Sequence, residues 1–164
     1  MSGKNTEKNI ETEGLSKLGG VTSYRYRNPG PDILEAFANL YPQRDYLITL
    51  THPEFTSLCP LTGQPDFATV TVRYVPDKLC VESKSFKLYM AAYRDHGAFM
   101  ESLTNKIADD LIAVLSPRRL SVSGVFNVRG GTAISVQVDH IDPSLPGTRR
   151  DSLASLWRIY SDSR

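Results

Sequence analysis

The 164-residue sequence has little of several features that often assign a protein to a class at once. Its 19 basic and 18 acidic residues nearly cancel, and a net charge of +1 gives no overall field to attract nucleic acid. Its two cysteines and three histidines lack the spacing of metal ligands, so we expect no metal site. No apolar run approaches the length of a membrane span, and we expect no membrane partner.

The amino-terminal region also lacks a recognisable signal. Residues 1–20 are polar and end in two glycines, without the apolar core of a secretory signal peptide. We expect this segment to be a disordered lead-in, followed by a single domain over residues 21–164. The absence of a secretion signal favours a cytoplasmic protein in which Cys59 and Cys80 remain free thiols.

Two kinds of hydrophobic periodicity are present. Apolar and polar side chains alternate over residues 67–75, which predicts a strand with one buried face. Phe86, Tyr89, Met90 and Tyr93 follow the spacing of an amphipathic helix instead. The other expected elements are a helical turn at 33–40, strands at 46–51, 120–128 and 132–141, a helix at 98–115 with Phe99, Leu103, Ile107, Leu111 and Val114 facing the core, and a terminal helix at 151–160.

The order of these elements defines the expected fold class. Two strands, two helices and two strands predict an α+β fold, a four-stranded antiparallel sheet with both helices on one face. Such a sheet leaves two open edges, which expose unpaired backbone groups. Assembly into a ring through the edge strands would pair them.

Cys59 is the first candidate for chemistry. It lies in residues 52–65, where three prolines and a glycine predict an irregular loop, and Asp66 follows directly. A lone cysteine is more often a small buried hydrophobic residue, and such an aspartate is more often a solvated turn residue. Together they provide a nucleophile and a general acid or base. We interpret Cys80, which has no comparable partner, as structural.

The start of the first helix is the second candidate. Ser83 and Ser85 are suitable N-cap residues, and free N–H groups at a helix start form an anion site together with Lys84 and Lys87. A capped surface helix with solvated lysines is the simpler alternative.

Two glutamates and an arginine complete the candidates. Glu82 and Glu101 have the simple interpretation of surface carboxylates, but a buried glutamate accepts paired N–H bonds from a guanine-like edge. Arg129 stands beside two glycines between expected strands, a position that suits contact with a phosphate. A plain hairpin with a flanking charge is the alternative for Arg129.

Three separate segments carry a resemblance to a known family. They are RDYLITLTHPEFTSLCPLTGQPDF, the Glu-Ser-Lys-Ser-hydrophobic-Lys-x-aromatic pattern at residues 82–89, and the Arg-Gly-Gly turn at residues 129–131. In order and spacing they resemble the short, single-domain form of the NADPH-dependent nitrile reductases that act on 7-cyano-7-deazaguanine in queuosine biosynthesis. Met100 departs from the pattern, because the family usually has a histidine there.

The resemblance implies a fold, an assembly and a mechanism. The fold would be the tunnelling fold, with subunits forming rings that stack into a decamer and with active sites at subunit interfaces. The Cys59 thiolate would attack the nitrile carbon to form a thioimide, and Asp66 would supply protons. Two hydrides from two NADPH molecules would complete the reduction to the amine.

The resemblance also implies which residues bind ligands. Glu82 and Glu101 would hold the deazaguanine base, with further contacts from Val81 and Ser83, and Phe99 would stack on the ring. The expected partners of the NADPH phosphates are Lys84, Lys87 and Arg129.

Two other functions remain open at the level of sequence. One is a paralogue of the same fold that binds the nitrile covalently but transfers ammonia or another amine and needs no NADPH. The other is a non-catalytic protein of this fold that binds a purine or pterin, because fold alone does not fix function. A zinc-dependent cyclohydrolase fits less well, since the ligand residues are missing.

Overall fold

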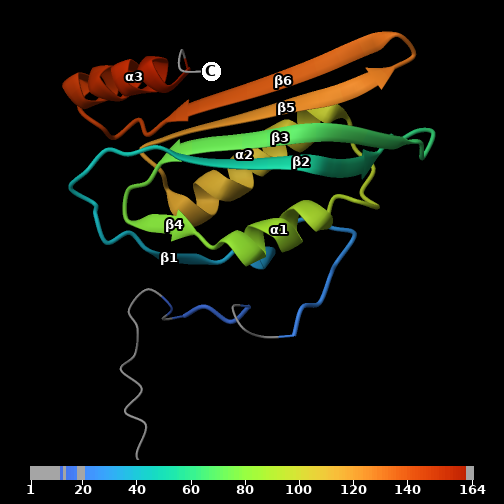
Figure 1. Ribbon diagram of the computed structural model, residues 1–164, viewed down its shortest axis with the longest axis horizontal. Coiled ribbons are helices and arrows are strands. Elements are labelled where there is room, and N and C mark those ends of the chain that lie inside the picture. Colours follow the sequence, from blue (N-terminus) through green and yellow to red (C-terminus); the bar gives the residue numbers. More distant parts are fainter. Residues whose placement is uncertain (1–11, 13, 18–20, 162–164) are drawn as a thin grey trace, which may run out of the picture.

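The computed structural model describes residues 12, 14–17 and 21–161 (Figure 1), with the side chains of 159–161 left aside. The expected disorder of residues 1–20 therefore falls largely outside the described part. In that part the chain forms, in order, η1 (Pro31–Ile33), β1 (Ala36–Ala38), β2 (Ile48–Leu58), β3 (Pro65–Val75), β4 (Leu79–Val81), α1 (Ser83–Ala91), α2 (Met100–Leu115), β5 (Arg119–Arg129), β6 (Thr132–Ile141) and α3 (Gly147–Ser161).

The main sheet has the predicted composition. Among the described residues its strand order is β2-β3-β5-β6, and every neighbouring pair is antiparallel. Helices α1 and α2 cover one face, and α3 lies at one end on the other side (Figure 1). The α+β class and the two helices on one face are thus confirmed. Strands β2 and β6 have one neighbour each in the described part, which leaves their outer edges open.

Two expectations about the first third of the domain were wrong. Residues 33–40 do not form a helical turn, because the chain makes a short 3-10 helix at Pro31–Ile33 and then pairs β1 with β4 in a second, two-stranded sheet. The strand expected at 46–51 begins at Ile48 and continues to Leu58. A register shift between His52 and Phe55 lets the strand pass Pro53, since a bulge tolerates the missing N–H of proline.

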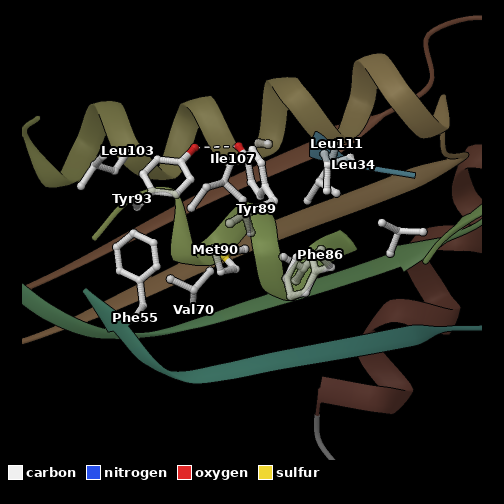
Figure 2. Close-up of a cluster of buried hydrophobic side chains, with 14 of the residues drawn as sticks. Leu34, Phe55, Val70, Phe86, Tyr89, Met90, Tyr93, Leu103, Ile107 and Leu111 are labelled. Atoms are coloured by element: carbon white, nitrogen blue, oxygen red, sulfur yellow. Dashed lines mark hydrogen bonds between the residues drawn. The ribbon is translucent and has the colours of Figure 1, made fainter. Parts of the chain in front are cut away.

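The predicted helical stripe of α1 is the centre of the core. Phe86, Tyr89, Met90 and Tyr93 are all buried, and they pack between the sheet and α2 (Figure 2). On α2, Leu103, Ile107 and Leu111 are buried as predicted, and the helix ends at Leu115, before Ser116 and Pro117. Phe99 was wrongly assigned to this stripe.

A polar network runs through this apolar core. The Tyr89 hydroxyl donates to Asp110 Oδ2 over 2.7 Å and lies 2.6 Å from the Tyr93 hydroxyl. Lys106 forms an ion pair of 2.9 Å with the same carboxylate oxygen of Asp110. The network joins α1 to α2, because its members come from both helices.

We expect Tyr89→Phe to lower the free energy of unfolding by about 1–3 kcal/mol, since a buried acceptor loses its donor. Urea unfolding would measure the change. The matched control is Tyr24→Phe, because Tyr24 is 56% exposed, and it should change stability by less than about 0.5 kcal/mol. Equal effects of the two substitutions would contradict a stabilising role of the network.

Candidate functional site

Cys59 lies at the end of a hairpin strand. The loop between β2 and β3 covers only residues 59–64, so the expected loop at 52–65 was too long. The Cys59 N–H donates to the Gln64 carbonyl over 2.8 Å, and the Gly63 N–H donates to the Cys59 carbonyl over 3.0 Å. These bonds continue the ladder beyond Leu58 and hold the backbone of the cysteine on both sides.

The bulge in β2 decides which way Cys59 faces. Alternate residues of a strand point to opposite faces, so one inserted residue reverses the alternation. Before the shift, His52 lies opposite the buried Val70; after it, the buried residues are Phe55, Ser57 and Cys59. Without the inserted residue, Cys59 would point away from the helices.

A second contact ties the thiol loop to the start of α2. Leu58 forms an isolated parallel bridge with Gly97: its N–H donates to the His96 carbonyl over 3.1 Å, and its carbonyl accepts from Ala98 over 3.2 Å. A Cβ on Gly97 would lie 3.3 Å from the Pro60 Cα, so the close approach suits a residue without a side chain. The bridge brings the first turn of α2 beside the thiol.

The surroundings of the sulfur favour the thiolate. The Thr62 hydroxyl, with the backbone N–H groups of Thr62 and Leu61 and with Arg129, lowers the pKa of Cys59 to about 7. The pKa of Cys80 shifts in the opposite direction, because burial of this thiol raises its pKa. Both cysteines are free. No motif in the sequence pointed to Thr62, although hydroxyl residues in a tight loop are known partners of backbone and side-chain groups.

Asp66 is buried and paired. Its side chain is only 4% exposed, and its Oδ1 accepts from Arg129 Nη1 over 2.8 Å. On β3 it lies opposite Ser57, which places it on the same face as Cys59. Arg129 therefore belongs to the thiol site in this structure, in addition to any contact with a cofactor.

Five of the predicted site residues line one small cavity. Its volume is about 110 Å³, and the predicted residues in its wall are Cys59, Asp66, Phe99, Glu101 and Arg129. Phe99 is the N-cap residue of α2 and is 57% exposed, while Glu101 is exposed in the first turn. The wall also contains Met100 and Ile134, and Met100 is 7% exposed. The cavity thus combines a thiol, a carboxylate and an aromatic ring.

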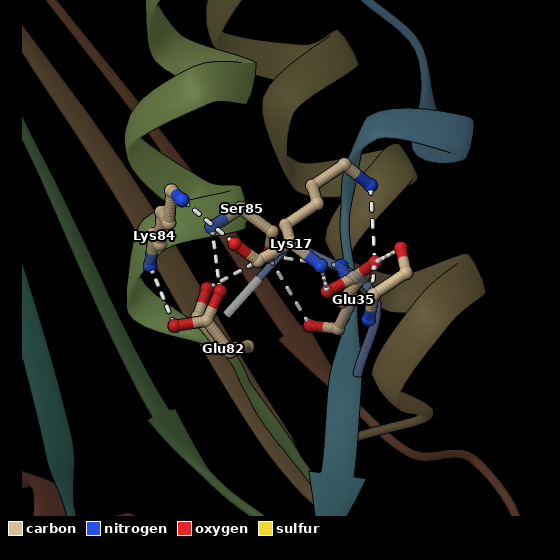
Figure 3. A network of polar contacts seen from close by, with 6 residues as sticks. Lys17, Glu35, Glu82, Lys84 and Ser85 are labelled. Carbon is tan, nitrogen blue, oxygen red and sulfur yellow. Dashed lines mark hydrogen bonds and ion pairs between the residues drawn. The ribbon is translucent and has the colours of Figure 1, made fainter. Parts of the chain in front are cut away.

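The other predicted residues lie at the start of α1. Glu82, rather than Ser83 or Ser85, caps this helix: its two carboxylate oxygens accept from the N–H groups of Lys84 and Ser85, each over 2.7 Å (Figure 3). The expectation of serine N-caps and of free N–H groups there was wrong. The glutamate side chain is longer than that of serine, and its two oxygens accept from both N–H groups, which otherwise lack a partner at the start of a helix.

The surroundings of Glu82 include Ser16 and Lys17 from the amino-terminal region. Glu35 accepts hydrogen bonds from Ser16 and Lys17, and the Lys84 ammonium donates to the Lys17 carbonyl over 2.7 Å (Figure 3). The positions next to Glu82 differ in exposure: Val81 is buried and Ser83 exposed.

The structure therefore divides the predicted residues into two groups. None of the group at Val81–Lys87 is in the wall of the thiol cavity, as far as the described residues show. In the same chain, the start of α1 lies apart from the β2–β3 hairpin (Figure 1). Among the described residues, no three His, Cys, Asp or Glu side chains gather as for a metal ion, and no helix could cross a membrane.

Comparison with known proteins places this antiparallel sheet, its two covering helices and the thiol site in the QueF-like class. The family model described as QueF-like protein matches residues 65–144. A crystal structure of the archaeosine synthase QueF-Like in the apo form is similar with a TM-score of 0.54 and 22% sequence identity. The similarity covers 61% of this chain and 96% of that one, and it shows a common fold.

Curated relatives identify the family more closely. The NADPH-dependent 7-cyano-7-deazaguanine reductase of Nitratidesulfovibrio vulgaris is 48% identical over 156 residues, which cover 93% of this chain and 94% of that protein. The protein of the same name from Desulfovibrio desulfuricans is 50% identical over 86% of this chain and 85% of its own length. The protein of the same name from Bacillus licheniformis is 44% identical over 96% of this chain and 93% of its own length. The chain belongs to the NADPH-dependent 7-cyano-7-deazaguanine reductase family, as its motifs indicated.

We expect Cys59 to react with iodoacetamide at a rate that rises with pH and levels off above about 7, because only the thiolate is nucleophilic. Below that pH the sulfur is protonated and the rate falls. Thr62→Val should move the midpoint to higher pH, since it removes the hydroxyl that favours the thiolate. Intact-mass measurements between about pH 5 and about pH 9 would give the rates.

Cys59→Ser is the control for this labelling. Its remaining thiol, Cys80, is buried with a raised pKa, so labelling at neutral pH should nearly disappear. Unchanged labelling of Cys59→Ser would show that the reactive thiol is Cys80.

Proposed function

We propose that this chain is a cytoplasmic NADPH-dependent 7-cyano-7-deazaguanine reductase of queuosine biosynthesis, which reduces the nitrile to an aminomethyl group. The observation that carries this proposal is a thiol with a pKa of about 7 that shares a cavity with the buried Asp66 carboxylate. The relatives that carry this name along nearly all of this chain support it.

Cys59 and Asp66 are suited to the covalent step. Asp66, paired with Arg129 as a carboxylate, takes the thiol proton, and the sulfur adds to the nitrile carbon. The new C–S bond uses the sulfur electron pair, and the same proton then passes from Asp66 to the nitrile nitrogen. The product is a neutral thioimide on Cys59, and Asp66 is a carboxylate again.

Reduction then needs two hydrides, which NADPH supplies when bound, one from each of two molecules. After the first hydride transfer and before the second, the C–S bond breaks and Cys59 leaves as a thiolate. Asp66 lines the same cavity as the sulfur and can carry protons to the nitrogen at each stage. Division of a difficult reduction into steps on a thiol lowers each barrier.

Phe99 and Glu101 are suited to hold the base next to the sulfur. Phe99 is 57% exposed although it is a large aromatic residue, so its ring is available to stack on a planar ligand. Glu101 is exposed in the first turn of α2, and its carboxylate can accept paired N–H bonds from a guanine-like edge.

We infer that Val81, Glu82 and Ser83 reach the substrate from a neighbouring subunit. They do not line the thiol cavity of their own chain, and the open edges of β2 and β6 suit assembly into a ring or stacked rings. Glu82 would keep its capping bonds and offer the remaining acceptor positions of its oxygens.

Lys84, Lys87 and Arg129 are proposed partners of the NADPH phosphates. Lys87 is exposed and Lys84 half-buried, and cationic side chains of this kind fit a dinucleotide. The N–H groups of Lys84 and Ser85 do not fit this role, because Glu82 already occupies them.

Mass spectrometry would test the proposal. Incubation with 7-cyano-7-deazaguanine alone should add one substrate mass to the protein, and NADPH should release the aminomethyl product with two NADPH oxidised per product. Cys59→Ala should form no adduct and lose turnover by at least about a thousandfold. A wild-type adduct that NADPH leaves unchanged, but that ammonium converts to an amidine, would identify the amine-transferring alternative.

A further inference from the structure

The ion pair between Arg129 and Asp66 assigns the arginine a role that the family resemblance did not imply. We propose that Arg129 is a positioning residue for covalent adduct formation, which holds the Asp66 carboxylate against Cys59 before any hydride is transferred. This inference rests on the proposed function and deepens it. It differs from the expected role of Arg129, contact with an NADPH phosphate, which would matter only once the cofactor binds.

A bulge in β5 turns Arg129 toward Asp66. Strands β5 and β6 pair Phe126 with Ile134 but Arg129 with Thr132, so β5 has one residue more than β6 between the two pairs. Because one inserted residue reverses the alternation of side chains, Arg129 lies on the same face as the buried Phe126. Regular alternation would have turned it to the opposite face.

The turn that follows fixes the arginine rather than leaving it on a loose loop. Gly130 and Gly131 have φ angles of 61° and 80°, which suit a two-residue hairpin turn of type I′. Residues with a side chain rarely adopt both angles, so the two glycines allow the ladder to continue up to Arg129. The guanidinium is therefore carried by a paired strand end.

The burial of Asp66 makes its partner important. An ionised carboxylate that is 4% exposed is costly unless it is paired, and Arg129 Nη1 provides that pairing over 2.8 Å. The ion pair also fixes one carboxylate oxygen, which limits the orientations that Asp66 can take toward the sulfur.

The charge balance around Cys59 depends on the same residue. The charged side chains that line the cavity with the thiol are Asp66, Glu101 and Arg129. Arg129 is the single cation among the described residues that line the cavity, and it is one of the groups that lower the pKa of Cys59. Without it, two carboxylates would face the thiolate, and like charges disfavour its formation.

Arg129 still has N–H groups for a second partner. Its side chain is 38% exposed, and a guanidinium has five N–H donors. Contact with a cofactor phosphate and the ion pair with Asp66 are thus compatible, and they predict different defects when the arginine is changed.

The experiment compares wild type, Arg129→Gln, Arg129→Lys and, as a control, Arg150→Gln on the exposed surface of α3. Adduct formation with 7-cyano-7-deazaguanine is followed by intact mass without NADPH, and Cys59 alkylation by iodoacetamide is followed against pH. Arg129→Gln should slow the adduct by at least about tenfold and raise the midpoint of alkylation, because the thiol loses its positioned base and its cation.

Arg129→Lys keeps the charge and should restore the alkylation midpoint and part of the adduct rate, while Arg150→Gln should match wild type. Thermal unfolding midpoints of the variants show whether slow adduct formation reflects a damaged fold. If Arg129→Lys has wild-type stability but forms the adduct more slowly than wild type, the result would still support the positioning role of Arg129.

Wild-type rates and midpoints in both Arg129 variants, with a raised KM for NADPH, would overturn the inference and leave the arginine as a phosphate ligand alone. The absence of a wild-type adduct would overturn the proposed function instead. In that case an unchanged pH midpoint of Cys59 alkylation in Arg129→Gln would also show that Arg129 does not lower the pKa of the thiol.

Discussion

The site depends on the strict alternation of side chains along a β-strand. Asp66 faces the helices because it keeps the register of β3, in which Ala68, Val70 and Val72 are buried. Cys59 and Arg129 reach that face only because β2 and β5 each contain one inserted residue. Two local irregularities thus bring a nucleophile and a cation to a carboxylate that regular geometry already positions.

The rest of the fold holds this arrangement in place. The bridge between Leu58 and Gly97 joins the thiol loop to α2, so the packing of α2 on the core also fixes the cavity. The Tyr89–Asp110 bond connects α2 to α1 within the same core. The small cavity is therefore anchored to the buried core, which favours a preorganised site.

Much of the fold followed from the sequence. Alternation over residues 67–75 predicted β3, and helical spacing from Phe86 to Tyr93 predicted the buried face of α1, because both periods are long and regular. The course of β2 did not follow, since Pro53 normally ends a strand and only the bulge allows it to continue. Similarly, Phe99 fits the α2 stripe by spacing, but it precedes the helix and turns outward.

The candidate site was predictable in composition and less so in geometry. Motifs selected Cys59, Asp66 and Glu101, whereas the pairing of Arg129 depends on a bulge that no residue type announces. For Glu82 the motif indicated a ligand-binding carboxylate, but in the structure this carboxylate binds the N–H groups at the start of its own helix. A sequence motif does not show that these N–H groups compete with a ligand. Residue identity therefore indicated the chemistry, and strand register decided which groups meet.

A crystal structure of the protein with 7-cyano-7-deazaguanine and no NADPH would show directly whether Cys59, Asp66 and Arg129 act together on the nitrile. We expect continuous density from Cys59 Sγ to the former nitrile carbon, with the Asp66–Arg129 ion pair beside it and the base between Phe99 and Glu101. Substrate bound without a bond to Cys59, or Arg129 turned away from Asp66, would rule out this arrangement.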